Sequence, residues 1–145
     1  MNATIARFGY PATLVAEYDH WVVLLRPTQP TLGALVLAAR SESLSFAALA
    51  PEAFAELRRA VADIEAALQA AIGFEKINYL MLMMVDPHVH FHVIPRYEGV
   101  RETRGVTVVD HGWPKAPALG EAVELAPEPI AALVGHLRAY WPSAT

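Results

Sequence analysis

The order of apolar and polar residues along the chain predicts strands first and a long helix after them. Residues 13–18 and 21–25 are rich in β-branched, aromatic and leucine residues, and the two polar residues between them suit a hairpin. Residues 26–33 carry two prolines and a glycine, so we expect no regular structure there. Residues 34–38 form an apolar run short enough for a third, buried strand.

From Pro51 the apolar residues change to a helical spacing. They recur at steps of three or four, with charged residues off the stripe, which consists of Phe54, Leu57, Val61, Ile64, Leu68 and Ile72. Pro51 near the first turn and Gly73 after the last apolar position are usual start and stop signals. We therefore expect one long helix over residues 51–72.

The remaining chain predicts a second hairpin and a second helix. Residues 76–85 and 88–97 are β-like runs joined by a turn that contains a proline. Residues 105–109 are expected to form a short edge strand, and residues 111–127 to be irregular. An apolar stripe over residues 129–140 predicts a closing helix.

Composition narrows the class of protein. A chain of 145 residues that is 54% hydrophobic is expected to form one domain over residues 1–145. A net charge of −4 argues against binding a nucleic acid through bulk electrostatics, and the absence of cysteine excludes disulfides, thiolate metal sites and cysteine nucleophiles. The most apolar stretch, residues 77–85, is about half of a membrane span, so we expect a cytoplasmic protein without nucleic-acid or membrane partners.

Three of the six histidines lie within five residues, as His88, His90 and His92. Because side chains of a strand alternate between its faces, the three imidazoles are expected on one face and the intervening apolar residues on the other. Neighbouring imidazoles would stand roughly 6.6 Å apart along the strand, and the outer pair about 13 Å.

This spacing leaves three interpretations open. Zinc needs ligand nitrogens within roughly 4 Å of one another, so two of these histidines could bind a metal with a third ligand from elsewhere, whereas all three on a flat strand could not. No further histidine, cysteine or HExxH motif lies nearby in the sequence to complete such a site, so we expect no metal. The middle imidazole could instead act as a nucleophile toward phosphorus, since an imidazole with a pKa near 6.5 is largely neutral at pH 7. The third interpretation is a solvated strand face without chemistry.

The segment HVHFHVIP, from His88 to Pro95, resembles the His-φ-His-φ-His-φ-φ signature of the histidine triad (HIT) family. The resemblance implies a HIT-like α+β fold with an antiparallel sheet and one long helix, to which the apolar stripe over residues 129–140 adds a C-terminal helix. It also implies a homodimer without a cofactor that hydrolyses or transfers nucleotidyl groups of a nucleotide or dinucleotide substrate. By motif position His90 is the nucleophile that attacks the α-phosphorus, and His88 and His92 flank it.

Three other residues are candidates for binding the substrate. Asn78 lies near a position where the family often places a phosphate-contacting Asn or Gln. Arg96 follows the triad directly and has the fork geometry suited to phosphate. Trp113, in an irregular stretch bounded by proline, could stack on a base.

The sequence also departs from the family pattern. Met83, Met84 and Val85 stand where many members have a Gly-Gln-Ser/Thr stretch that touches phosphate, and Gly33 is followed by alanine instead of a histidine. The residue that commonly binds the ribose hydroxyls falls near Leu25 or Arg26, neither of which accepts hydrogen bonds through its side chain. These departures keep open a nucleotide- or metal-binding module without catalysis.

Overall fold

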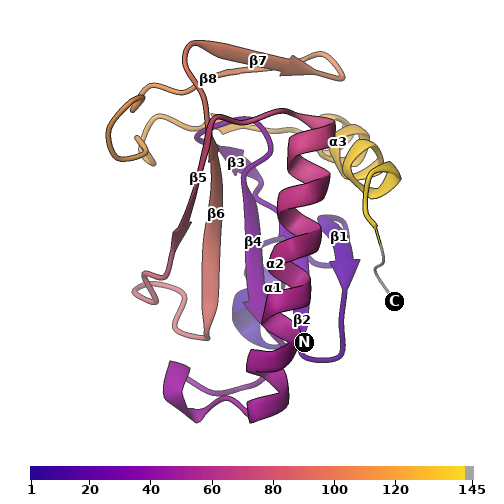
Figure 1. Cartoon of the computed structure of the whole chain (residues 1–145), viewed down its shortest axis with the longest axis vertical. Coiled ribbons are helices and arrows are strands. Elements are labelled where there is room, and N and C mark those ends of the chain that lie inside the picture. Colours follow the sequence, from indigo (N-terminus) through magenta and orange to yellow (C-terminus); the bar gives the residue numbers. More distant parts are fainter. Residues whose placement is uncertain (143–145) are drawn as a thin grey trace.

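The structure, a computed structural model that describes residues 1–142, is built on a five-stranded antiparallel sheet (Figure 1). The strand order is β1-β2-β4-β6-β5, with bounds Leu14–Glu17, Trp21–Leu25, Leu35–Ala39, His90–Arg96 and Lys76–Leu80 respectively. Together with the helices below, this confirms the expected α+β class. The last three residues of the domain predicted over residues 1–145 lie outside the described residues, and that single-domain assignment stays a prediction.

Three α-helices and two small sheets complete the chain. The helices are α1 (Ala3–Arg7), α2 (Pro51–Ala71) and α3 (Pro127–Ala139), with a 3-10 turn, η1, at Phe46–Ala48. Strand β3 (Thr28–Gln29) pairs with β9 (Val123–Glu124), and β7 (Val100–Thr103) pairs with β8 (Val106–Val109). None of the helices within residues 1–142 is both long and apolar enough to cross a membrane.

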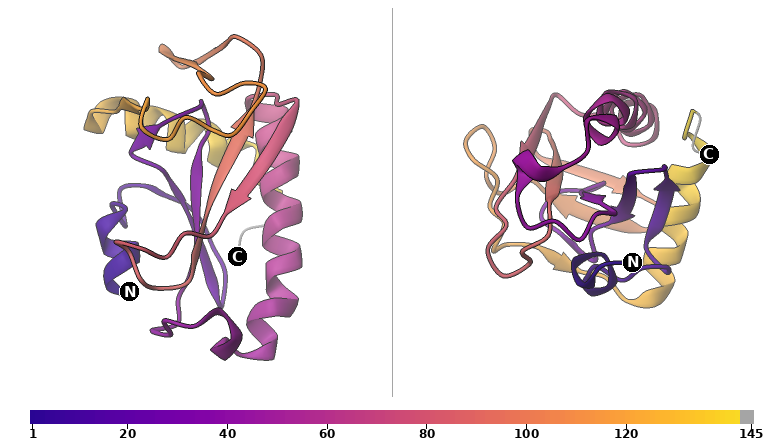
Figure 2. Two further views of the ribbon diagram at one scale, coloured as in Figure 1. Left: turned by 90° about the vertical axis from the view of Figure 1, so that its left-hand side faces the viewer. Right: turned by 90° about the horizontal axis from the view of Figure 1, so that it is seen from below.

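The main sheet lies between α2 on one face and α1 on the other, as Figure 2 (left) shows. Strand alternation explains the two layers, because β2 and β4 are buried along their whole length. Leu35 and Leu37 of β4 belong to the larger core that includes buried residues of α2 and α3. Val36 and Ala38 of the same strand belong to a smaller core together with Ile5 of α1. The sheet therefore has two covered faces of different size.

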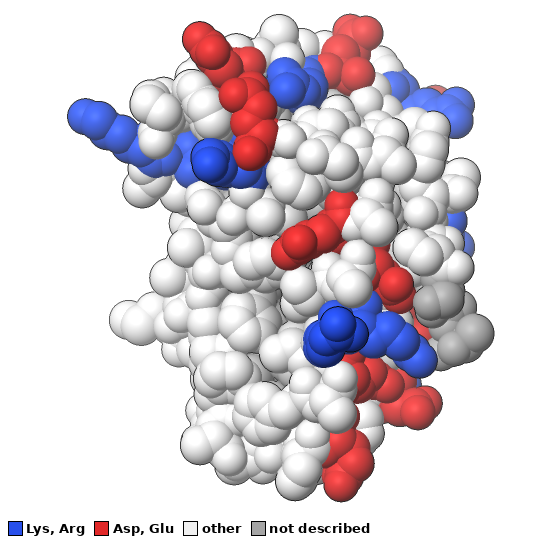
Figure 3. All heavy atoms as spheres, in the orientation of Figure 1, with Lys and Arg blue, Asp and Glu red and all other residues white. Residues whose placement is uncertain are grey.

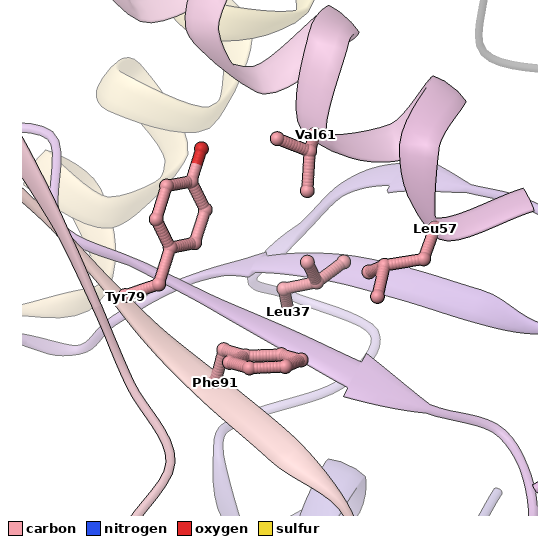
Figure 4. Close-up of a pocket in the computed structure, with 5 residues that line it drawn as sticks. All are labelled: Leu37, Leu57, Val61, Tyr79 and Phe91. Carbon is pink, nitrogen blue, oxygen red and sulfur yellow. The ribbon is translucent and has the colours of Figure 1, made fainter. Parts of the chain in front are cut away.

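Helix α2 follows the predicted stripe only in its second half. Ile64 and Leu68 are buried, whereas Phe54 is 39% exposed and the buried residues in the first half of the helix are Ala53 and Ala60. Leu57 and Val61 line an apolar cavity of about 140 Å³ together with residues of β4, β5 and β6 (Figure 4). Charged side chains run along the surface over α2, and the neighbouring surface over β5 carries few (Figure 3).

The second hairpin is shorter than predicted. Strand β5 ends at Leu80 and β6 begins at His90, so residues 81–89 form a loop. Met83 in this loop has a positive φ of 52°, a conformation that interrupts a strand. His88 therefore lies in the loop and only His90 and His92 stand on the strand, which corrects the expectation of three histidines on one strand.

Short elements account for the other differences from the predictions. Helix α1 has only five residues, and the segments expected to be irregular contain β3 and β9, which pair with each other across the chain. The predicted edge strand at residues 105–109 is β8, and its partner β7 was not predicted. Two- to five-residue elements are too short to display a periodicity.

A buried ion pair joins β6 to the segment that follows β8. Arg96 and Asp110 are 3% and 5% exposed, and Nε and Nη2 of Arg96 donate to the two carboxylate oxygens at 2.8 and 3.2 Å. Asp110 also accepts from the backbone N–H of Tyr97 and Gly112. These bonds satisfy both buried charges and attach the C-terminal part of the chain to the sheet.

We expect Asp110→Ala to lower the free energy of unfolding by about 3 to 5 kcal/mol, because it leaves Arg96 buried without its counter-ion. Urea denaturation followed by circular dichroism measures this. Glu75→Ala is the matched control, since its ion pair with Arg101 is partly exposed and is worth about 1 kcal/mol or less. Equal, small losses in both variants would contradict a structural role for Asp110.

Candidate active site

His90 and His92 stand at the start of β6 on the face that α1 covers. Their partners across the ladder are Ala38 and Val36 of β4, which fixes both imidazoles on that face. The two ring centroids are 5.0 Å apart with nearly perpendicular planes, and the residues are 2% and 6% exposed. The strand thus brings two of the three predicted histidines together.

A backbone carbonyl determines the tautomer of His90. Nδ1 of His90 lies 2.7 Å from the carbonyl oxygen of His88. Because a carbonyl oxygen only accepts hydrogen bonds, Nδ1 carries the proton. In the neutral ring Nε2 then keeps its lone pair, which is the form that a nucleophile requires.

His92 has the opposite tautomer. Nε of Arg26, which is always protonated, donates to Nδ1 of His92 at 3.4 Å, so the proton of neutral His92 lies on Nε2. Burial, with smaller contributions from the charges of Arg26 and His90, lowers the pKa of His92 to about 4. At neutral pH His92 is therefore a hydrogen-bond donor and not a source of an acidic proton.

His88 lies in the loop before β6, and its side chain is held by other contacts. The hydroxyl of Thr4 in α1 is 2.9 Å from its Nδ1 and accepts from its backbone N–H at 3.3 Å. Its Nε2 is 3.5 Å from Oε1 of Glu42, an exposed side chain. His88 thus contributes its carbonyl to His90 and ties the loop before β6 to α1.

A cavity of about 220 Å³ opens next to His90 and His92. Its other lining residues are Phe8, Arg26, Leu82, Met83, Met84, Val85 and Asp86. Phe8 contacts both imidazoles, with centroid distances of 5.7 Å. The polar groups of the wall are therefore two imidazoles, one guanidinium and one carboxylate, and the rest is apolar.

Sequence reasoning did not identify Thr4, Phe8 or Arg26 as site residues. A signal for α1 exists in hindsight: Asn2 is an N-cap residue whose side chain accepts from the N–H of Ile5, and Ile5 and Phe8 have helical spacing. Arg26 was considered only for its inability to accept hydrogen bonds from a ribose.

The residues described do not contain a group of three or more histidine, aspartate or glutamate side chains arranged to hold a metal ion. His90 and His92 are held in opposite tautomers by a carbonyl and a guanidinium. The arrangement presents one nitrogen lone pair and one N–H beside a cavity, which suits attack on a phosphoryl group.

A family model, the HIT domain, matches residues 8–99, which include the histidine strand and its sheet. The chain belongs to the HIT domain family. Membership of this family suggests a nucleotide-binding or hydrolase-type activity. No protein of curated function is recognisably similar to the chain in sequence.

Solved HIT structures share the fold of this chain. A histidine triad protein from Sinorhizobium meliloti 1021 superposes with a TM-score of 0.74 at 23% identity, over 97% of this chain and 95% of that one. One from Bradyrhizobium japonicum gives 0.73 at 17% identity, covering 97% and 96%. A Zn-bound histidine triad family protein from Mycobacterium smegmatis gives 0.55 at 18% identity, covering 93% and 92%.

The three substrate-binding candidates lie away from the walls of this HIT cavity. Asn78 accepts a hydrogen bond from Nη1 of Arg96 at 2.8 Å, so both belong to the buried cluster around Asp110. Arg96 is on the same strand face as His92 but four residues along, or about 13 Å. Trp113 is partly exposed in the segment after Asp110. Their predicted contacts with substrate stay predictions.

The lowered pKa of His92 predicts a pH dependence of stability. Between pH 6.5 and 4 the unfolded chain protonates this histidine while the folded chain does not, so stability is lost as the pH falls through that window. We expect a contribution of about 1 to 2 kcal/mol, after discounting for partial solvent screening. Urea unfolding at pH 7 and pH 4.5 of wild type and His92→Asn measures it. The same pH difference in both proteins would contradict the assignment.

Proposed function

We propose that this HIT protein is a nucleotidyl hydrolase or transferase that attacks the α-phosphorus of a nucleotide-like substrate with Nε2 of His90. The observation that carries the proposal is the hydrogen bond from Nδ1 of His90 to the carbonyl of His88. It leaves the nucleophilic lone pair on a ring that lines the cavity. A dinucleoside polyphosphate or a nucleoside phosphoramidate is the substrate class that the motif implies.

The reaction would proceed in two steps. First, a bond forms between Nε2 of His90 and phosphorus, and the bond from phosphorus to the leaving group breaks; the leaving group departs with the electron pair and takes up a proton. Second, water or another acceptor attacks phosphorus, loses a proton, and displaces His90. Splitting the displacement in this way is the usual advantage of covalent catalysis.

The flanking histidines would have different tasks. Neutral His92 would donate from Nε2 to the charge that develops on a phosphoryl oxygen, since it does not protonate near pH 7. His88 would orient His90 through its carbonyl. Asn78, Arg96 and Trp113 stay proposed as substrate contacts outside the cavity wall.

The second candidate is a nucleotide- or metal-binding HIT module without catalysis. It is favoured by the apolar side of the cavity, where Met83, Met84 and Val85 offer no side-chain hydrogen bond to phosphate. Tight nucleotide binding without a covalent adduct, or stoichiometric metal in protein purified without added metal, would support this candidate over the enzyme.

We expect His90→Ala to fold normally and to lose turnover by about 10³-fold or more, because the nucleophile is removed. Intact mass spectrometry after mixing with an adenosine phosphoramidate, and separately with diadenosine tetraphosphate, should show a nucleotidyl increment on the wild type alone.

His20→Ala is the control for this experiment, because His20 lies in the turn between β1 and β2 and is an isolated histidine. It should retain both adduct and turnover. Retained turnover in His90→Ala would overturn the mechanism. Greater losses in His88→Ala and His92→Ala than in His90→Ala would overturn the roles assigned above.

The expected homodimer also belongs to this proposal. Strand β5 is an edge of the main sheet, so its outer side pairs with no strand among the described residues. The apolar cavity of Leu57, Val61, Tyr79 and Phe91 lies beside it, and the ring of Phe46 contacts the rings of Phe54 and Phe91. An unpaired edge next to an apolar surface suits a second copy of the chain.

We expect light scattering to give twice the chain mass of 15.8 kDa. Phe54→Glu should shift the protein toward the single-chain mass, because it places a charge in the apolar surface. Tyr140→Glu is the matched control, since Tyr140 is a similarly exposed aromatic residue at the end of α3. A wild-type mass of one chain would refute the dimer.

A further inference from the structure

Arg26 is a cation in the wall of the cavity, and no acidic side chain within the described residues pairs with it. It follows β2 directly, and its Nη1 donates to the backbone and hydroxyl oxygens of Thr28 at 2.9 and 2.7 Å, both neutral groups. Its Nε donates to His92. Within residues 1–142 its guanidinium forms no ion pair, and Nη2 makes no hydrogen bond.

The surroundings of this guanidinium favour an anion. Burial lowers the pKa of Arg26, because the cation loses part of its hydration. Asp86, the acidic residue of the cavity wall, is paired with Arg7 of α1 at 3.0 Å. A ligand that brings its own negative charge would supply the ion pair that Arg26 does not form with any of residues 1–142.

We propose that Arg26 forms the anion subsite of this active site, where it binds a non-bridging oxygen of the reacting phosphoryl group and keeps the proton of His92 on Nε2. The inference deepens the proposed function and rests on it for the identity of the ligand. It makes Arg26 a phosphate-binding residue through Nη2 and a positioning residue through Nε.

The chemistry of the wall supports this double role. The side chains that the loop before β6 contributes to the cavity wall are apolar except for Asp86, whose negative charge would repel phosphate. Arginine is suited to phosphate because its planar guanidinium presents several N–H groups in fixed directions. The bonds to Thr28 hold the group in place before a ligand arrives, which reduces the ordering cost of binding.

The test compares Arg26→Met, which removes the charge at similar length, with Arg26→Lys, which keeps the charge and loses the fork. Arg104→Met is the matched control, because Arg104 lies in the turn between β7 and β8 and does not line the cavity. Nitrogen-15 NMR of the histidine rings reports the tautomer and pKa of His92. Titration of the same signals with inorganic phosphate, and with adenosine 5′-monophosphate, reports anion binding.

In the wild type and Arg104→Met we expect Nε2-protonated His92 and saturable binding of both anions. In Arg26→Met the tautomer of His92 should become mixed. The pKa of His92 should rise, because the charge of Arg26 that lowers it is removed while the charge of Asp86 that raises it remains. Phosphate binding should weaken at least about 10-fold. Arg26→Lys should bind phosphate with an intermediate affinity while losing the single tautomer.

Unchanged phosphate binding in Arg26→Met would overturn the anion subsite, and an unchanged tautomer would overturn the positioning role. Both readouts are independent of turnover. If the wild type forms no nucleotidyl adduct, the proposed function fails, while the ring signals and phosphate titration still decide the role of Arg26.

Discussion

The alternation of side chains along β6 is the constraint on which the site depends. This strand lies between β4 and β5, and its odd-numbered residues Phe91 and Val93 face the core beneath α2. Since successive side chains point to opposite faces, His90 and His92 face α1. The burial of the apolar face therefore also orients both imidazoles. A shift of one residue in register would place the histidines in the core and the apolar residues on the face toward α1.

Orientation alone does not decide what an imidazole does, because each ring has two nitrogens. In this protein the partner of Nδ1 determines where the proton of each ring lies. For His90 the partner is a carbonyl oxygen, which only accepts, and for His92 it is a guanidinium, which only donates. Two adjacent rings of identical chemistry thus become one lone-pair nitrogen and one N–H group. The difference arises from residues outside the strand, and it exists before any substrate binds.

The sequence predicted the parts of this arrangement that depend on local pattern. The motif and its period of two identify His90 and His92, and the helical spacing after Pro51 identifies α2. The contact of Arg26 with His92 was beyond such reasoning, because it joins the end of β2 to β6 across β4, and the pattern of each strand leaves their mutual register open. The strand predicted over residues 76–85 is wrong for residues 81–85. These residues are apolar like a strand, yet they form a loop in which Met84 and Val85 are 81% and 74% exposed.

Helix α1 has a consequence for the order in which the molecule assembles. Thr4 and His88 are separated by 84 positions, and a five-residue helix has little stability of its own before it packs on the sheet. A contact between distant positions is stable only when its favourable free energy exceeds the entropy lost in closing the chain between them. We therefore expect the sheet to form before α1 docks, so that the pocket around the histidines closes late in folding and opens early on unfolding.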